Sequence, residues 1–134
     1  QTGSISNEPV RDYYSSGQLQ FEGKMISLDP EILDGLCVYY YPNGNKMSEG
    51  MVTNGQKSGQ WKDYHENGNL KLTSNYAINP MASPTPNDPL GKNRVYEMNG
   101  VWIHYNEDGM KYKKEVYTFG NLTSTKDIKI KPKK

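Results

Sequence analysis

The sequence predicts an all-β protein, an antiparallel meander of repeated β-hairpins that forms an elongated, open and curved sheet. The first observation behind this prediction is a tight-turn signal that recurs with a tyrosine four residues before its glycine. The second is a further glycine, which stands nine residues before the turn glycine in three copies. Because one hairpin cannot bury its own apolar face, repeated hairpins stack on their neighbours. The residues that define the repeat are Tyr13, Gly17, Gly35, Tyr40, Gly44, Gly59, Trp61, Tyr64, Gly68, Gly100, Trp102, Tyr105 and Gly109.

These repeats predict a single domain over residues 10–125, which suits a chain of 134 residues. Successive turn glycines are 27, 24 and 41 residues apart, so a period of 24 leaves one short and one long insertion. Residues 1–9 are expected to form a flexible N-terminal segment, and residues 126–134 a lysine-rich tail. The repeat units are expected to cover about residues 10–25, 35–55, 59–76 and 100–117.

The two insertions predict different local structures. In the short insertion, Asp29 followed by Pro30 and Glu31 matches a helix N-cap and first turn, which predicts a single helical turn. The long insertion, residues 77–93, contains four prolines, which a central strand does not accept. It therefore predicts a surface loop that joins the third and fourth units.

Other signals predict the remaining turns and the last strand. Asn54-Gly55 and Asn99-Gly100 each predict a type I′ turn, because that turn needs positive φ at both central residues. From Lys126 onward, apolar and charged residues alternate, which is typical of an edge strand whose lysines oppose aggregation.

The composition favours a folded sheet with a shallow core. Only 34% of the residues are hydrophobic, but 11 are tyrosines, whose rings pack while their hydroxyls stay in water. The 16 basic and 15 acidic residues nearly cancel, so no nucleic-acid partner is expected. The single cysteine, Cys37, stands where other units carry Trp61 and Trp102, which indicates a buried structural thiol.

Alternation along each strand assigns the repeat tyrosines and their neighbours to opposite faces of the sheet. The repeat tyrosines share one face. The other face is polar and aromatic, which is a composition enriched in recognition surfaces and also suits the solvated side of a thin sheet. Strict alternation puts Trp61 and Trp102 on this second face, so either a bulge re-aims them or both faces are partly covered. The candidate binding residues on the second face are Tyr14, Tyr39, Tyr41, Asp63, His65 and His104.

No combination of residues in the sequence predicts catalysis or metal binding. A metal site needs three or four converging ligands, whereas His65 and His104 occupy different places in their repeats. Paired carboxylates occur only as turn neighbours, and no nucleophile is accompanied by a base. We therefore expect no catalytic residues, no metal, no cofactor and no small-molecule substrate.

Two segments of the chain resemble a known repeat family. Residues 59–68, Gly-Gln-Trp-Lys-Asp-Tyr-His-Glu-Asn-Gly, and residues 100–109, Gly-Val-Trp-Ile-His-Tyr-Asn-Glu-Asp-Gly, are similar to the core of a MORN repeat in its bacterial variant form. The second unit keeps the glycines and the tyrosine but has Cys37 in place of tryptophan, and the first unit lacks both the leading glycine and the tryptophan.

The resemblance implies an elongated sheet of hairpins that binds or scaffolds rather than catalyses. Family members are linked to protein partners and some to acidic lipids, and some variant-repeat proteins carry antitoxin-like labels. The expected function is thus a non-enzymatic protein-interaction module, with an acidic-membrane module or an antitoxin-like protein as alternatives. The polar start Gln1-Thr2-Gly3-Ser4 suits residues after a signal-peptide cleavage site. It suggests an exported protein (periplasmic, cell-surface or secreted), with a cytoplasmic location left open.

Overall fold

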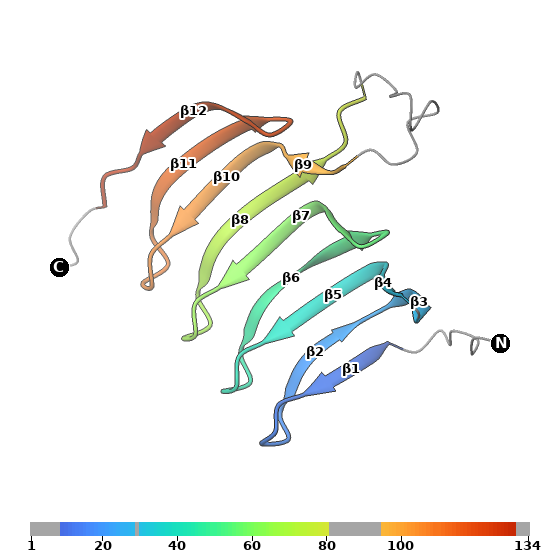
Figure 1. Ribbon diagram of the computed structural model, residues 1–134. Helices are drawn as coiled ribbons and strands as arrows, with labels where there is room; N and C mark the ends of the chain where they lie inside the picture. The colour runs from blue at the N-terminus through green and yellow to red at the C-terminus, as the bar shows by residue number, and fades with distance from the viewer. Residues whose placement is uncertain (1–8, 29, 81–94, 131–134) are drawn as a thin grey trace.

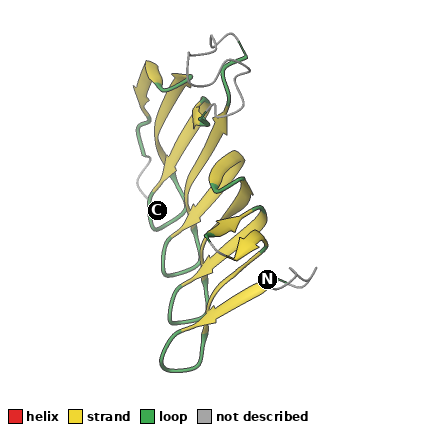
Figure 2. Ribbon diagram, turned by 45° about the vertical axis from the view of Figure 1, so that its right-hand side comes forward, coloured by secondary structure: helices red, strands yellow, loops and turns green. Residues whose placement is uncertain are grey.

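The computed structural model describes residues 9–28, 30–80 and 95–130 of the chain. Its main sheet is an antiparallel meander with the strand order β1-β2-β5-β6-β7-β8-β10-β11-β12, and β9 pairs with β8. Strands β3 and β4 form a separate two-stranded sheet. Figure 1 shows the main hairpin turns side by side at one end of the strands. The sheet is open, with β1 and β12 as its edge strands. The predicted all-β class is confirmed, since the described residues contain strands and loops but no helix (Figure 2).

The longest strand, β7, lies in the middle of the main sheet. Their bounds are β1 Val10–Tyr13, β2 Leu19–Gly23, β3 Met25–Leu28, β4 Glu31–Leu33, β5 Gly35–Tyr40, β6 Lys46–Thr53, β7 Gln56–Tyr64, β8 Leu70–Ala77, β9 Glu97–Met98, β10 Gly100–Tyr105, β11 Lys111–Thr118 and β12 Asn121–Asp127.

The four repeated hairpins share one turn geometry. In the second unit, the Tyr41 amide donates to the Asn45 carbonyl at 2.8 Å, and the Gly44 amide donates to the Tyr41 carbonyl at 2.9 Å. The other three turns repeat both bonds at the same distances. Their glycines have φ between 87° and 99°, a left-handed conformation that glycine adopts without a steric penalty. The recurring glycine in the sequence is therefore explained by the backbone of the turn.

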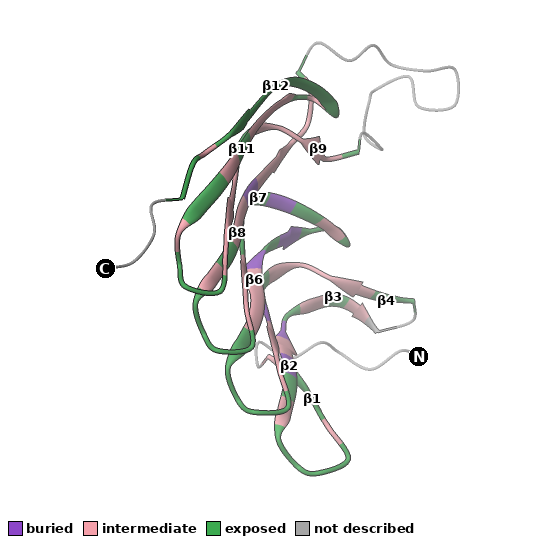
Figure 3. Ribbon diagram, turned by 90° about the vertical axis from the view of Figure 1, so that its left-hand side faces the viewer, coloured by how far each residue is buried: buried purple, intermediate pink, exposed green. Residues whose placement is uncertain are grey.

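A β-bulge follows each of these turns. Tyr40 pairs with Lys46 while the preceding Tyr39 pairs with Ser48, so Met47 is the extra residue of the second strand. The same register shift occurs beside Tyr13, Tyr64 and Tyr105. Bulges bend a strand and increase its twist. In Figure 3 the strands of the main sheet bend toward the side that holds β3 and β4.

The connecting turns between units agree with the prediction at one site and differ at another. Asn54 and Gly55 have φ of 49° and 82°, as a type I′ turn requires. Asn99-Gly100 was the wrong choice for the second such turn, because Asn99 does not have positive φ and connects β9 to β10. The equivalent turn is Phe119-Gly120, with φ of 43° and 88°. The Phe119 amide donates to Oδ1 of Asn99 at 3.1 Å, which stabilises this conformation in a residue that rarely adopts it.

The predicted helical turn at Asp29-Pro30-Glu31 is wrong. The chain forms the hairpin β3–β4 at this point, with Met25 paired to Leu33 and Leu28 to Glu31, and Pro30 lies in the connection. A lone helical turn fixes several backbone dihedrals for a single hydrogen bond. The hairpin instead lets Leu33 pack against the core of the main sheet.

The core lies on one face of the main sheet, which we call the inner face and which β3–β4 partly covers. Its buried cluster consists of Phe21, Cys37, Val52 and Trp61, against which Leu33, Tyr39 and Tyr76 pack. Trp61 shares a face with Asp63, and Trp102 with His104, as alternation assigns them, because no register shift lies between the two residues of either pair. No bulge re-aims the two tryptophans. They are buried because neighbouring side chains of the described chain cover them on this face.

Glycines on the inner face make room for these large side chains. Gly50 pairs with Trp61, and a Cβ atom built on Gly50 would lie 2.3 Å from Cδ2 of that indole. A Cβ atom on Gly23 would lie 2.5 Å from the ring of Phe21. Cys37 pairs with Gly50 and is fully buried, which explains a small side chain where other units carry tryptophan.

The final strand was predicted from Lys126 onward, but it begins earlier and ends at Asp127, so residues 128–130 are not in a strand. Strand β12 runs Asn121–Asp127, and its register places Lys126 and Asp127 in the positions that Lys62 and Asp63 occupy on β7. It therefore resembles the first strand of a further unit. The predicted N-terminal segment up to residue 8, most of the proline-rich loop (81–94) and the last four residues lie outside the described residues.

Candidate functional site on the inner face

The middle of the inner face is a row of side chains contributed by all nine strands of the meander. Cross-strand partners share a face of a sheet, so the pairings define this row directly. We call it the inner row: Asp12, Phe21, Tyr39, Ser48, Asp63, Leu72, His104, Lys113 and Asp127.

The neighbouring row on the opposite face has the opposite charge balance. We call it the outer row: Arg11, Glu22, Val38, Glu49, Lys62, Thr73, Ile103, Lys114 and Lys126. The inner row holds three aspartates against one lysine, whereas the outer row holds four basic residues against two glutamates. The nearly neutral chain is therefore divided into an acidic inner row and a basic outer row.

Asp63 is the central acid of the inner row. Its side chain lies between Ser48 and Leu72 and makes no hydrogen bond or ion pair within the described residues. Burial raises the pKa of Asp63, while the positive charges of Lys57 and Lys71 act in the opposite direction. A partly buried carboxylate without a donor costs free energy in the unbound protein. A bound partner that supplies a donor or a cation would remove that cost.

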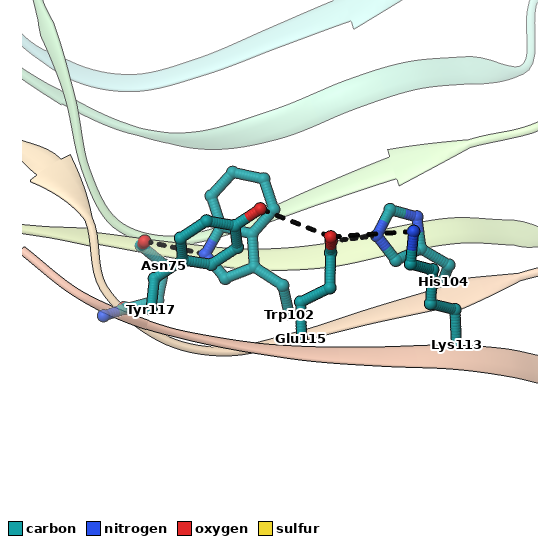
Figure 4. Close-up of polar contacts among 6 residues, drawn as sticks. All are labelled: Asn75, Trp102, His104, Lys113, Glu115 and Tyr117. Atoms are coloured by element: carbon teal, nitrogen blue, oxygen red, sulfur yellow. Dashed lines mark hydrogen bonds and ion pairs between the residues drawn. The ribbon is translucent and has the colours of Figure 1, made fainter. Parts of the chain in front are cut away.

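Of the six candidate residues, Tyr39, Asp63 and His104 share the inner row. Tyr39 packs on Phe21 with ring centroids 4.8 Å apart, so its ring belongs partly to the core. Burial also raises the pKa of its phenol. His104 lies on β10, where its Nε2 is 2.7 Å from a carboxylate oxygen of Glu115 (Figure 4).

The other three candidates hold neighbouring units together near their turns. The Tyr14 hydroxyl donates to the carbonyl of Tyr40 at 2.5 Å, and the Tyr41 hydroxyl donates to that of Tyr64 at 2.7 Å. His65 makes the same contact in the third unit, with its Nε2 3.0 Å from the carbonyl of Tyr105. In the first three units, the residue after the repeat tyrosine therefore bridges to the next unit, and this role was missed in the sequence.

Asparagines reinforce the same bridges. Asn43 and Asn45 both donate to the carbonyl of Glu66, at 2.9 and 2.8 Å. Asn67 and Asn69 repeat this arrangement on Glu107, each at 2.8 Å. These contacts occur at the same offsets from the turn glycine, so comparison of the units in register could have revealed them.

Glu115 organises the C-terminal part of the inner face. Besides His104, it accepts from the Tyr117 hydroxyl at 3.3 Å and lies 3.7 Å from Nζ of Lys113 (Figure 4). The hydrogen bond from His104 is the main cause that lowers the pKa of Glu115. Beside this cluster, Trp102 packs between the rings of Tyr76 and Tyr117.

We expect Glu115→Gln to lower the free energy of unfolding by about 1 kcal/mol near neutral pH. Because the folded-state pKa of Glu115 is lowered, its stabilising effect is present above its unfolded pKa of about 4.5 and is lost as the pH falls through the folded value. Urea unfolding from about pH 6 to about pH 3 should show the two stabilities converging in acid. A constant difference across that range would contradict the assigned role of the carboxylate.

A hollow lies between the N-terminal part of the main sheet and β3–β4. Its volume is about 350 Å³, and Asp12 and Glu31 are the charged residues that line it. Its other lining residues are Gln20, Phe21, Met25, Leu33 and Tyr39. Sequence reasoning missed this hollow because it depends on the β3–β4 hairpin, which was predicted as a helical turn.

On the outer face, the repeat tyrosine Tyr64 forms part of a hydrogen-bonded group. The Tyr64 hydroxyl donates to Oε2 of Glu49 at 2.5 Å, and Lys46 pairs with the same carboxylate at 3.0 Å. Burial and the neighbouring Glu49 raise the pKa of Tyr64 to about 12. Next to this group, Leu36 and Met51 are cross-strand partners with about half of their surface exposed, 54% and 47%.

The described part of the chain contains neither a metal-binding cluster nor a membrane-spanning helix. No group of three or more His, Cys, Asp or Glu residues there is arranged to hold a metal ion. No helix that could cross a membrane occurs in those residues either.

The family comparison agrees with the repeated geometry. The model of the MORN repeat variant matches residues 33–54 and 57–77, which are the second and third units. No curated protein and no solved structure matches the chain. MORN-repeat proteins are generally non-enzymatic and often bind proteins or membranes. The first and fourth units share the turn bonds and the bulge of the two matched units. Residues 33–54 and 57–77 therefore contain MORN repeats of the variant type, and the first and fourth units share their hairpin geometry.

Proposed function

We propose that this protein is a non-enzymatic interaction module that binds a basic region of another protein along its inner row. The observation that supports the proposal most directly is Asp63, a partly buried carboxylate with no hydrogen-bond donor among the described residues. Asp12 and Asp127 extend the acidic character of the row to both edges of the sheet. Partly exposed aromatic and polar groups around them, such as Tyr39 and His104, supply the mixture that interfaces favour.

Electrostatic complementarity gives such an interface its specificity and its rate of association. A basic partner would meet the acidic row on the inner face and would be repelled by the lysines on the outer face. Binding should weaken as salt is added, because charges on an open sheet are screened within about 8 Å at physiological ionic strength.

The experiment selects a displayed library of random peptides on the immobilised protein. We expect enrichment of lysine and arginine among the selected peptides, and loss of their binding by at least about tenfold on Asp63→Lys, which corresponds to about 1.4 kcal/mol. The matched control is Lys62→Glu, which reverses a charge at the adjacent residue on the opposite face. Loss of binding on Lys62→Glu with retention on Asp63→Lys would assign the function to the outer face.

The outer face suggests a second candidate function, attachment to an acidic membrane surface. Lys62, Lys114 and Lys126 lie in one row of this face, and the exposed Leu36 and Met51 lie beside it. Basic residues contribute about 1 kcal/mol each near an anionic bilayer, and apolar side chains add to that attraction.

Sedimentation with phosphatidylserine vesicles distinguishes the two functions. As a protein-binding module, the wild type should not sediment with vesicles at physiological salt. Firm binding that is lost in the triple variant Lys62→Gln, Lys114→Gln, Lys126→Gln would replace the first proposal with the second.

A further inference from the structure

The hollow beside β3–β4 combines an apolar interior with two unpaired carboxylates. Phe21, Tyr39 and Leu33 belong to the core cluster or pack against it, and they form one side of the hollow. Asp12 and Glu31 are both exposed and make no hydrogen bond or ion pair within the described residues. Among the described residues that line the hollow there is no lysine or arginine. The charge of the hollow is therefore unbalanced.

This hollow lies beside one open edge of the main sheet. Asp12 belongs to β1, which pairs with β2 on one side and is the end of the strand order on the other. An edge strand presents free backbone donors and acceptors, onto which an extended peptide can add as a further strand. Figure 3 shows β3 and β4 on one side of the sheet next to β2 and β1.

We infer that the edge of β1 binds an extended peptide of a partner protein, and that the hollow takes one lysine or arginine side chain of that peptide. In an antiparallel addition, the peptide residue opposite Asp12 points to the same face as Asp12. That face is the inner one, so the side chain enters at the acidic rim of the hollow. Its methylene groups then lie against Phe21 and Met25, while its cationic end pairs with Asp12 and Glu31.

The hollow selects against other side chains by its chemistry. An acidic side chain would face two carboxylates, and a neutral apolar side chain would leave both unpaired. Lysine and arginine combine an apolar stem with a charged end, as this site requires. The inference rests on the proposed function and narrows it, because it gives one end of the inner row a defined ligand and binding mode.

The test measures the affinity of the full chain for a short capped peptide of threonine and valine with one central lysine, by fluorescence anisotropy. We expect replacement of the lysine by norleucine to weaken binding at least about tenfold, since a charge-assisted contact is lost. In an added strand, the backbone amides of every second peptide residue donate hydrogen bonds to β1. N-methylation of these amides should therefore abolish binding. Equal binding of the norleucine peptide would overturn the assignment of the hollow.

Two protein variants and a matched control complete the test. Asp12→Asn and Glu31→Gln keep the side-chain shape and should each weaken the lysine peptide several-fold. Asp127→Asn changes the acid of the same row at the opposite edge, and it should leave the affinity unchanged. Equal losses of affinity in all three variants would mean that binding depends only on the total charge of the inner face. That result would contradict a specific site at the hollow.

Competition by a small amine distinguishes binding in the hollow from addition to the edge of β1. Butylammonium should compete with the peptide only weakly, because it cannot add to β1, and tight binding of the amine alone would contradict the strand addition. If the lysine peptide does not bind while the selected peptides still depend on Asp63, the inference fails and the proposed function stands. If no selected ligand depends on Asp63, the proposed function fails independently.

Discussion

Trp61→Ala is expected to lower the free energy of unfolding by about 3–5 kcal/mol, the usual cost of truncating a large buried aromatic side chain. Trp61 is only 1% exposed and lies in the buried cluster with Phe21, Cys37 and Val52. Its indole N–H donates to the carbonyl of Met51 at 2.8 Å, and Nζ of Lys57 lies 4.7 Å from the ring centroid. The variant would lose packing, a hydrogen bond and a cation–π contact at once.

Urea unfolding followed by far-ultraviolet circular dichroism measures this loss. The control is Leu36→Ala, which truncates a side chain that is 54% exposed on the outer face. Its effect should stay within about 0.5 kcal/mol, as is usual at the surface. Similar losses for the two variants would mean that the main core lies elsewhere than on the inner face.

Gly50→Val is expected to destabilise the protein by about 3 kcal/mol, the upper part of the usual range for overpacking. The first added carbon would lie 2.3 Å from Cδ2 and 2.5 Å from Cγ of Trp61, so the indole or the strand has to move. Gly50 lies within β6 and does not have positive φ, so the cost arises from the side-chain clash rather than from backbone strain.

A double-mutant cycle between Gly50→Ala and Trp61→Ala isolates the clash. Contacting residues show non-additive effects, so Gly50→Ala should cost much less free energy when residue 61 is already alanine. Ser74→Ala provides the control, because Ser74 pairs with Trp61 from the other side and already has a Cβ atom. Additive effects for Gly50 and Trp61 would show that the two residues do not share the same space.

The repeated part of the fold followed from the sequence because its turns require a specific residue. A backbone with φ near 90° selects glycine, so Gly17, Gly44, Gly68 and Gly109 marked four hairpins correctly. The turn at Phe119-Gly120 left no such signal, because its first residue is held by a side chain that is distant in sequence, that of Asn99. The β3–β4 hairpin was missed for a similar reason, since Leu33 gains its packing from the tertiary core.

Alternation along the strands predicted only part of the candidate site. Alternation correctly assigns Tyr39, Asp63 and His104 to one face, because no register shift separates them from Cys37, Trp61 and Trp102, which lie two residues earlier. It could not show that Tyr14 and Tyr41 bridge to carbonyls of the next unit, since those bonds depend on the distance between units. The charge separation between the two rows also required the register, which sequence alone did not provide.

Hydroxyl-radical footprinting of the protein with a selected peptide bound is the most direct test of the account, because it reports which side chains the ligand covers. We expect Tyr39 and His104 on the inner face to be protected, while Met51 and Leu36 on the outer face are oxidised as in the free protein. Protection of Met51 and Leu36 with unchanged oxidation of Tyr39 and His104 would contradict binding through the inner face.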